Sequence, residues 1–126
     1  MSTSLWLSRQ INTFKMVFEP NWLVQIPDRT DAEALRTRQD NVSAHVAHNK
    51  THMDAGRIVM SGPLVSIHSN NASNSSVPTG SVMVWKIDNE AKLRAYLSED
   101  LFVELGVWHL ERAMIVLFLC AMRKAL

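Results

Sequence analysis

The chain has 126 residues, of which 47% are hydrophobic and 20% charged, which predicts one globular domain with a core of its own. Its formal net charge of +1 gives no electrostatic reason to expect a nucleic acid or a membrane surface as partner. The single cysteine, Cys120, excludes an intrachain disulfide, and the apolar residues 113–122 cover only about half the length that spans a bilayer. We therefore expect a soluble, cytoplasmic protein.

The first residues differ in composition from the rest. Residues 1–18 contain two bases and no acid, a pattern that loosely fits a mitochondrial presequence and fits a poorly ordered extension better. We expect an N-terminal extension over residues 1–20, partly disordered, and a domain over residues 21–126. A short apolar run at residues 21–26 lies between prolines and predicts the first strand.

One long amphipathic helix is predicted next, capped by Thr30 or Asp31 and ended by Gly56. At about 100° per residue a narrow apolar stripe forms on it, and we expect this stripe to face the core. The stripe consists of Leu35, Val42, Val46 and Met53.

A polar seam of Arg38, Asn41, His45 and His52 lies beside the stripe, with His45 nearest the apolar side. A histidine at such a border can be half desolvated and still reach a cavity, as a general acid or base requires. Simple packing of the ring at the helix edge explains the same position.

Two further strands are expected at residues 57–67, interrupted at Gly62 and Pro63, and at residues 81–87. Residues 68–79, rich in Asn and Ser, predict a flexible loop between them. The strand at 81–87 is apolar on both faces. The two predicted helices can cover only one face of the sheet that contains it. The other face is therefore expected to meet a second copy of the sheet in a homodimer.

Residues 88–97 predict the second helix, capped by Asp88 or Asn89. Asp100 then opens a short turn that ends at Gly106. Residues 107–123 fit a helical stripe, but their β-branched and aromatic side chains favour a strand.

Chemistry-bearing residues are few. Two of the three histidines His45, His48 and His52 could share a zinc ion, but no glutamate follows His48 and no second ligand cluster is evident, so we expect no metal. The sequence has no nucleophile elbow and no glycine-rich phosphate loop. Proton transfer without a cofactor remains, and Asp100 fits either a helix cap or a carboxylate partner of His45.

An ordered set of short motifs resembles the YCII-related domain family and runs from about Trp22 to the end of the chain. The set comprises Arg38, His45, AGRIV at 55–59, SGPL at 61–64, GSV at 80–82, Asp100, Phe102 and GVW at 106–108. The resemblance implies an α+β, ferredoxin-like fold with a four-stranded antiparallel sheet, two helices on one face, and dimers that form an α+β barrel as in muconolactone isomerase. It also decides for a strand over residues 107–123.

The resemblance marks His45 and Asp100 as catalytic, and we expect Arg38, Ser61 and Trp108 to bind the substrate. Reactions known in the family include dehydrochlorination of a hydroxylated aromatic, and fungal members with a similar C-terminal tail are associated with secondary metabolism. The resemblance therefore implies a cofactor-independent lyase or isomerase. Its substrate would be a small aromatic or polyketide-derived compound, and its reaction a dehydration, elimination, cyclisation or isomerisation. A non-catalytic barrel that binds a small ligand, and a structural dimer with a vestigial pocket, are the alternatives.

Overall fold

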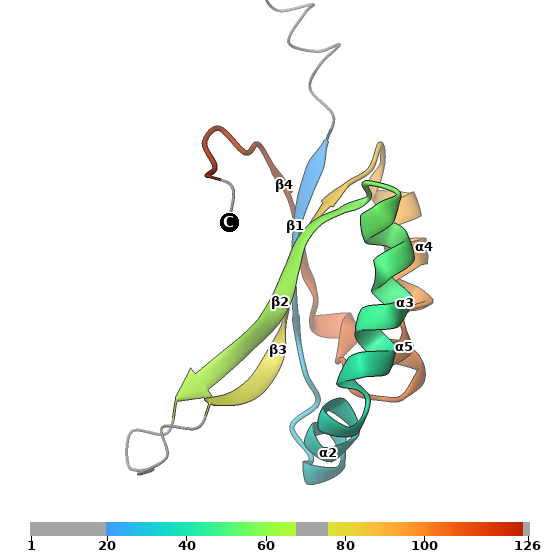
Figure 1. The fold of residues 1–126 in the computed structure, drawn as a ribbon, viewed down its shortest axis with the longest axis vertical. Coiled ribbons are helices and arrows are strands. Elements are labelled where there is room, and N and C mark those ends of the chain that lie inside the picture. Colours follow the sequence, from blue (N-terminus) through green and yellow to red (C-terminus); the bar gives the residue numbers. More distant parts are fainter. Residues whose placement is uncertain (1–19, 68–75, 125–126) are drawn as a thin grey trace, which may run out of the picture.

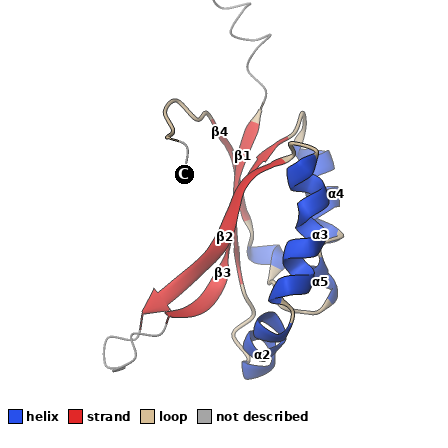
Figure 2. Cartoon of the chain, in the orientation of Figure 1, coloured by secondary structure: helices blue, strands red, loops and turns tan. Residues whose placement is uncertain are grey.

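The structure of the protein is a computed structural model, which describes residues 20–67 and 76–124. The elements follow in the order β1 Asn21–Pro27, α2 Ala32–Asp40, α3 Val42–Asp54, β2 Ile58–Ile67, β3 Ser76–Lys86, α4 Glu90–Ser98, α5 Leu101–Glu104, a 3-10 turn Leu110–Arg112 and β4 Met114–Phe118. The strands form one antiparallel sheet in the order β2-β3-β1-β4, and the helices lie on one face of it (Figures 1 and 2). The predicted ferredoxin-like α+β fold is confirmed.

The core lies between this sheet and the helices. In β1 and β3 alternate residues point toward the helices, so that Trp22 pairs with Trp85 and Val24 with Met83, and all four are buried. The helices add apolar side chains from α4 and α5 to the same cluster, among them Leu93, Leu97 and Phe102. The expected extension over residues 1–20 lies, apart from Pro20, outside the described residues.

The helical segment differs from the prediction in two ways. Instead of one helix there are two, separated at Asn41, whose backbone (φ −120°, ψ 17°) leaves the helical path. Asp31, rather than Thr30, caps α2 by accepting a hydrogen bond from the Ala34 amide. The apolar stripe does not face the core, since Val42 and Val46 are 50% and 63% exposed.

Polar residues, among them Arg38 of the predicted seam and Asn49, which was not assigned to it, lie on the inward side instead. Arg38 and Asn49 are the buried polar residues of α2 and α3, while Met53 on the stripe is half exposed. The helical wheel failed here because it assumes that the inward face is apolar, whereas an inward polar group such as the Arg38 guanidinium has buried partners in Asp28 and Ser81.

The hairpin of β2 and β3 also differs in detail. Pairing continues through Gly62 and Pro63, where an interruption was expected, and the register shifts lie between Ile58 and Met60 and between Leu64 and Val65. The expected loop over residues 68–79 falls partly outside the described residues, but its last part belongs to β3, which begins at Ser76.

The C-terminal segment is a strand over a shorter range than expected. Trp108 forms a bridge with Asp28, the 3-10 turn follows, and β4 covers only Met114–Phe118. Asn89 caps α4 through its side-chain oxygen. None of the helices in the described part of the chain is long and apolar enough to cross a membrane.

Candidate active site

His45 on α3 and Asp100 at the start of α5 are 55 positions apart in the chain, and their side chains are in contact. The imidazole Nε2 of His45, on α3, lies 2.8 Å from Oδ1 of Asp100. The same carboxylate oxygen accepts a hydrogen bond of 2.8 Å from the Phe102 amide and so caps α5. Asp100 is therefore both a helix cap and a partner of His45, and the catalytic role of the pair stays a prediction.

Aromatic rings fix the plane of the His45 imidazole. Phe102 stacks on it with a centroid distance of 3.7 Å and an interplanar angle of 9°, and Trp108 meets it edge-on at 5.5 Å. The His45 side chain is only 13% exposed and that of Asp100 only 3%. Nδ1 of His45 has no hydrogen-bonding partner among the described residues, so it is the ring nitrogen left for a ligand.

A buried polar network supports the two rings, Phe102 and Trp108, that enclose the His45 imidazole and that we call the aromatic clamp. The Arg38 guanidinium donates to both carboxylate oxygens of Asp28, at 2.6 and 2.9 Å, and to Oγ of Ser81 at 2.7 Å. Ser81 Oγ also accepts a hydrogen bond of 3.0 Å from Nε1 of Trp108. Arg38 lies over the Phe102 ring, 4.8 Å from its centroid. The network thus holds Phe102 and Trp108 in place around His45.

The three residues predicted to bind substrate lie in different settings. Trp108 is buried beside His45, with 1% exposure, and Arg38 is buried beside the Phe102 ring, with 5% exposure. Ser61 is exposed on β2, opposite Met83 of β3, and takes no part in the network described above. Ser81, not Ser61, is the serine whose hydroxyl belongs to the buried polar network of Arg38, Asp28 and Trp108. Substrate binding by Arg38, Ser61 and Trp108 stays a prediction.

Sequence reasoning missed Asn49, which is 8% exposed and lies one helical turn after His45. Its Nδ2 is 3.0 Å from Nε2 of His45, and its Oδ1 is buried without a partner among the described residues. The spacing of four residues from His45 was the signal for Asn49. Asp28 and Ser81 gave no such signal, because their contacts with Arg38 join different elements.

The other two histidines of α3, His48 and His52, lie nearer the C-terminal end of that helix. His52 packs against the rings of Trp85 and Tyr96, and its Nδ1 accepts a hydrogen bond of 3.0 Å from Nε of Arg57. Burial, and then the charges of Arg57 and His48, lower the pKa of His52 below 6.5. No group of three or more His, Cys, Asp or Glu residues within 20–67 and 76–124 could hold a metal ion.

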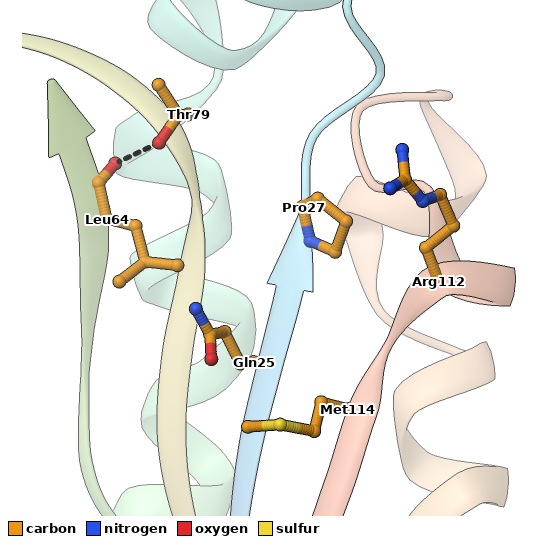
Figure 3. Close-up of a pocket in the computed structure, with 6 residues that line it drawn as sticks. All are labelled: Gln25, Pro27, Leu64, Thr79, Arg112 and Met114. Atoms are coloured by element: carbon orange, nitrogen blue, oxygen red, sulfur yellow. Dashed lines mark hydrogen bonds between the residues drawn. The ribbon is translucent and has the colours of Figure 1, made fainter.

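A hollow lies on the opposite face of the sheet, away from the helices (Figure 3). It has a volume of about 420 Å³ and contains one cationic side chain, that of Arg112, among apolar and neutral ones. Its lining residues are Gln25, Pro27, Leu64, Thr79, Arg112 and Met114. The hollow is therefore separated by the sheet from His45 and Asp100.

Comparisons with known proteins give related sequences and a similar fold. The sequence profile of the YCII-related domain matches residues 21–115. The Xenovulene A biosynthesis cluster protein asL2 of Sarocladium schorii is 41% identical over 110 residues, which cover 86% of this chain and 95% of that protein. The derivative of benzaldehyde biosynthesis cluster protein C of Emericella nidulans is 34% identical over 86 residues, or 68% of this chain and 86% of that protein.

Among solved structures, the 5-chloro-2-hydroxyhydroquinone dehydrochlorinase of Burkholderia phenoliruptrix, in complex with 2,5-dihydroxybenzoquinone, is similar in fold. The TM-score is 0.61 at 20% identity, covering 76% of this chain and 90% of that one. At this identity the likeness shows the fold alone. Both sequence relatives are fungal proteins of biosynthesis clusters.

Proposed function

The chain belongs to the YCII-related domain family, and on this premise we propose that it is a cofactor-independent lyase or isomerase with His45 and Asp100 as its acid/base pair. The substrate is a small aromatic or polyketide-derived compound. Relatives in biosynthesis clusters and a dehydrochlorinase of the same fold support this class of reaction. The observation that carries the proposal is the 2.8 Å contact of His45 with Asp100 inside a fixed aromatic clamp.

The chemistry follows from the two ring nitrogens. The ionised carboxylate of Asp100 accepts the Nε2 proton of His45, which leaves a lone pair on Nδ1. Nδ1 takes a proton from a carbon or an oxygen of the substrate, and the imidazolium that forms is stabilised by the buried carboxylate. In an elimination the electron pair of the broken C–H bond forms the new double bond, and the imidazolium returns its proton to the departing group.

In a dehydration the proton is returned to the departing hydroxyl group, and in an isomerisation to another carbon of the substrate. In a cyclisation the carbanion attacks a carbonyl carbon of the same molecule, and the proton is returned to the oxygen of that carbonyl group. Stacking on Phe102 prevents the imidazole from turning away between the two proton transfers. Arg38 lies over the Phe102 ring and Trp108 lies against the His45 imidazole, and we retain both as candidate substrate contacts. Ser61 would be reached only by a substrate that extends to β2.

The test separates proton transfer from binding. In D₂O, wild-type protein should exchange deuterium into a hydroxylated aromatic or cyclic polyketide substrate, and His45→Ala should slow both exchange and turnover by roughly 10²- to 10⁴-fold while ligand affinity is kept. His48→Ala, one turn along α3, is the matched control and should behave as wild type. Deuterium exchange as fast in His45→Ala as in wild type would rule out the proposed function.

The hollow on the open face of the sheet favours one alternative, a non-catalytic dimeric barrel that binds a small ligand there. A second sheet packed on this face would enclose the hollow, and Arg112 would provide a cation for an acidic ligand. In that case Arg112→Ala would abolish binding, His45→Ala would not affect it, and wild-type protein would show no turnover.

A further inference from the structure

We infer that Ser81 is a positioning residue: its hydroxyl fixes the Trp108 indole and, through it, the His45 imidazole in the orientation that proton transfer requires. The inference rests on the proposed function. It gives Ser81, on the strand β3, a role in the reaction that involves no contact with the substrate.

The direction of each hydrogen bond at Ser81 is fixed by its partner. Oγ of Ser81 lies 2.7 Å from Nη2 of Arg38 and 3.0 Å from Nε1 of Trp108. A guanidinium and an indole nitrogen can only donate, so the hydroxyl oxygen accepts both bonds. Neither bond depends on a tautomer or on the orientation of an amide. The oxygen has two lone pairs, and both are therefore in use.

The acceptor lies on an inner strand of the sheet. The backbone of Ser81 pairs with Ile26 of β1 on one side and with Pro63 of β2 on the other. The residue is buried, with 5% exposure. An oxygen held between two paired strands has little freedom to follow a ring that moves, so it provides a fixed point for the indole.

Trp108 depends on this bond for the orientation of its side chain. Its backbone is held by the bridge to Asp28 and by a hydrogen bond of 3.0 Å from its amide to the Phe102 carbonyl. These contacts leave the side-chain torsions free. Among the residues that the structure describes, Nε1 of Trp108 bonds to Ser81 alone, whereas Arg38 also bonds to both carboxylate oxygens of Asp28. Loss of the hydroxyl should therefore release the indole and leave the ion pair in place.

The indole in turn limits how the His45 ring can move. Asp100 contacts one nitrogen of this ring, and a single contact of this kind lets the ring pivot about it. Phe102 restricts the ring from its face, and Trp108 meets it edge-on at 5.5 Å and 86°. Trp108 also contacts Phe102, at 6.0 Å and 83°. The direction of Nδ1, the nitrogen proposed to exchange the proton, thus depends on where Ser81 holds the indole.

The kinetic test separates rate from binding. Turnover is read as exchange of the carbon-bound hydrogens of resorcinol for deuterium in D₂O. In Ser81→Ala we expect kcat to fall roughly 10- to 100-fold and KM to stay within about threefold of wild type, because a misdirected reacting group slows the chemical step. Ser81→Thr keeps the hydroxyl on a side chain that strands favour and should restore most of kcat. Ser66→Ala, at an exposed serine of β2, is the matched control and should behave as wild type.

The orientation itself is measured by NMR without substrate. Nuclear Overhauser contacts between ring hydrogens of Trp108 and His45 should be present in wild type and Ser81→Thr, and weak or absent in Ser81→Ala. Trp108→Phe removes the donated hydrogen from the other side of the bond and should lower kcat as Ser81→Ala does. In the Trp108→Phe background, Ser81→Ala should lower kcat by less than about twofold more, because the bond is already lost. Should Ser81→Ala fail to fold, wild-type kcat in Trp108→Phe would overturn the inference.

The inference and the proposed function can fail separately. A Ser81→Ala variant that is less stable but keeps the ring contacts and the wild-type kcat would make Ser81 purely structural and overturn the inference. If exchange in that variant still depends on His45, the proposed function stays intact. Exchange that does not depend on His45 would instead reject the proposed function, while loss or persistence of the ring contacts would still support or overturn the orienting role of Ser81.

Discussion

Asp100 combines two tasks that substitutions can separate. Its carboxylate caps α5 and contacts His45. Asparagine and serine are both good caps, so Asp100→Asn and Asp100→Ser should change the free energy of unfolding by less than about 1 kcal/mol. Neither carries a negative charge to stabilise the imidazolium, so turnover should fall by roughly 10²- to 10⁴-fold.

The double variant with His45→Ala should lose little more than either single variant, because the two residues act as a unit. Steady-state kinetics beside urea unfolding measures both quantities. Normal turnover with a large loss of stability would show that the contact is purely structural.

Arg38 is predicted from the structure to be a stabilising residue above all. Its ion pair with Asp28 is buried, with both side chains 6% exposed. Removing one partner leaves the other charge buried alone, so Arg38→Met should cost roughly 3–5 kcal/mol in urea unfolding. The double variant Asp28→Leu with Arg38→Met should recover part of this loss. Equal stability of Arg38→Met and wild type would contradict the observed pairing.

His52 should make stability depend on pH. Burial and the charges of Arg57 and His48 lower its pKa in the folded state below 6.5, while the charges of Asp100 and Glu99 oppose this. As pH falls below about 6.5 the unfolded chain takes up the proton first, so acid favours unfolding; above that pH the effect is absent. Between about pH 7.5 and pH 5, the free energy of unfolding should therefore fall more steeply in wild type than in His52→Gln. Parallel curves for the two proteins would contradict this.

At the residue scale, the resemblance in the sequence led to His45 and Asp100 but not to the groups that support them. Ser81 and Asp28 become neighbours of Arg38 only because β1, β3 and α2 pack together, at separations of 43 and 10 residues from it. Nothing local in the sequence encodes such contacts. Asn49 could have been found, had the inward face of α3 been assigned correctly.

At the scale of elements, strands were predicted better than helices. Both β1 and β3 were predicted from short apolar runs, which are local features of the sequence. β1 lies close to its expected range, whereas β3 ends within one residue of the expected position but begins five residues earlier, at Ser76. The helical wheel failed because α2 and α3 turn a polar face to the sheet, which only their tertiary partners make stable. Val42 and Val46 therefore remain exposed.

Gly80 gives a prediction about the pairing of β1 with β3. A Cβ built at Gly80 would lie 2.5 Å from the carbonyl oxygen of Ile26 and 3.2 Å from Cα of Pro27, which are backbone atoms of the neighbouring strand. Gly80→Ala must push the strands apart and should cost about 1–3 kcal/mol in urea unfolding. Gly62→Ala, where a Cβ would meet no atom within 4 Å, is the control in the same sheet and should cost less.

At the scale of the whole molecule, the helices cover one face of the sheet and the other stays open (Figure 1). By the register, Met60, Met114, Val116 and Phe118 lie on this open face, and they are 38–54% exposed. We propose that the sheet of a second copy covers them in a homodimer, because a continuous apolar face of this kind marks an interaction surface.

Charged substitutions on the two faces test this assembly. A specific interface buries about 1,200 Å² or more, and a lysine at its centre would be desolvated without a partner. Val116→Lys should therefore yield monomers in light scattering at micromolar concentration, with a lower melting temperature. Val46→Lys, at a more exposed valine on the helical side, is the matched control and should remain dimeric. A wild-type protein that is monomeric at this concentration, with a melting temperature independent of dilution, would exclude the dimer and leave the open face without the partner proposed for it.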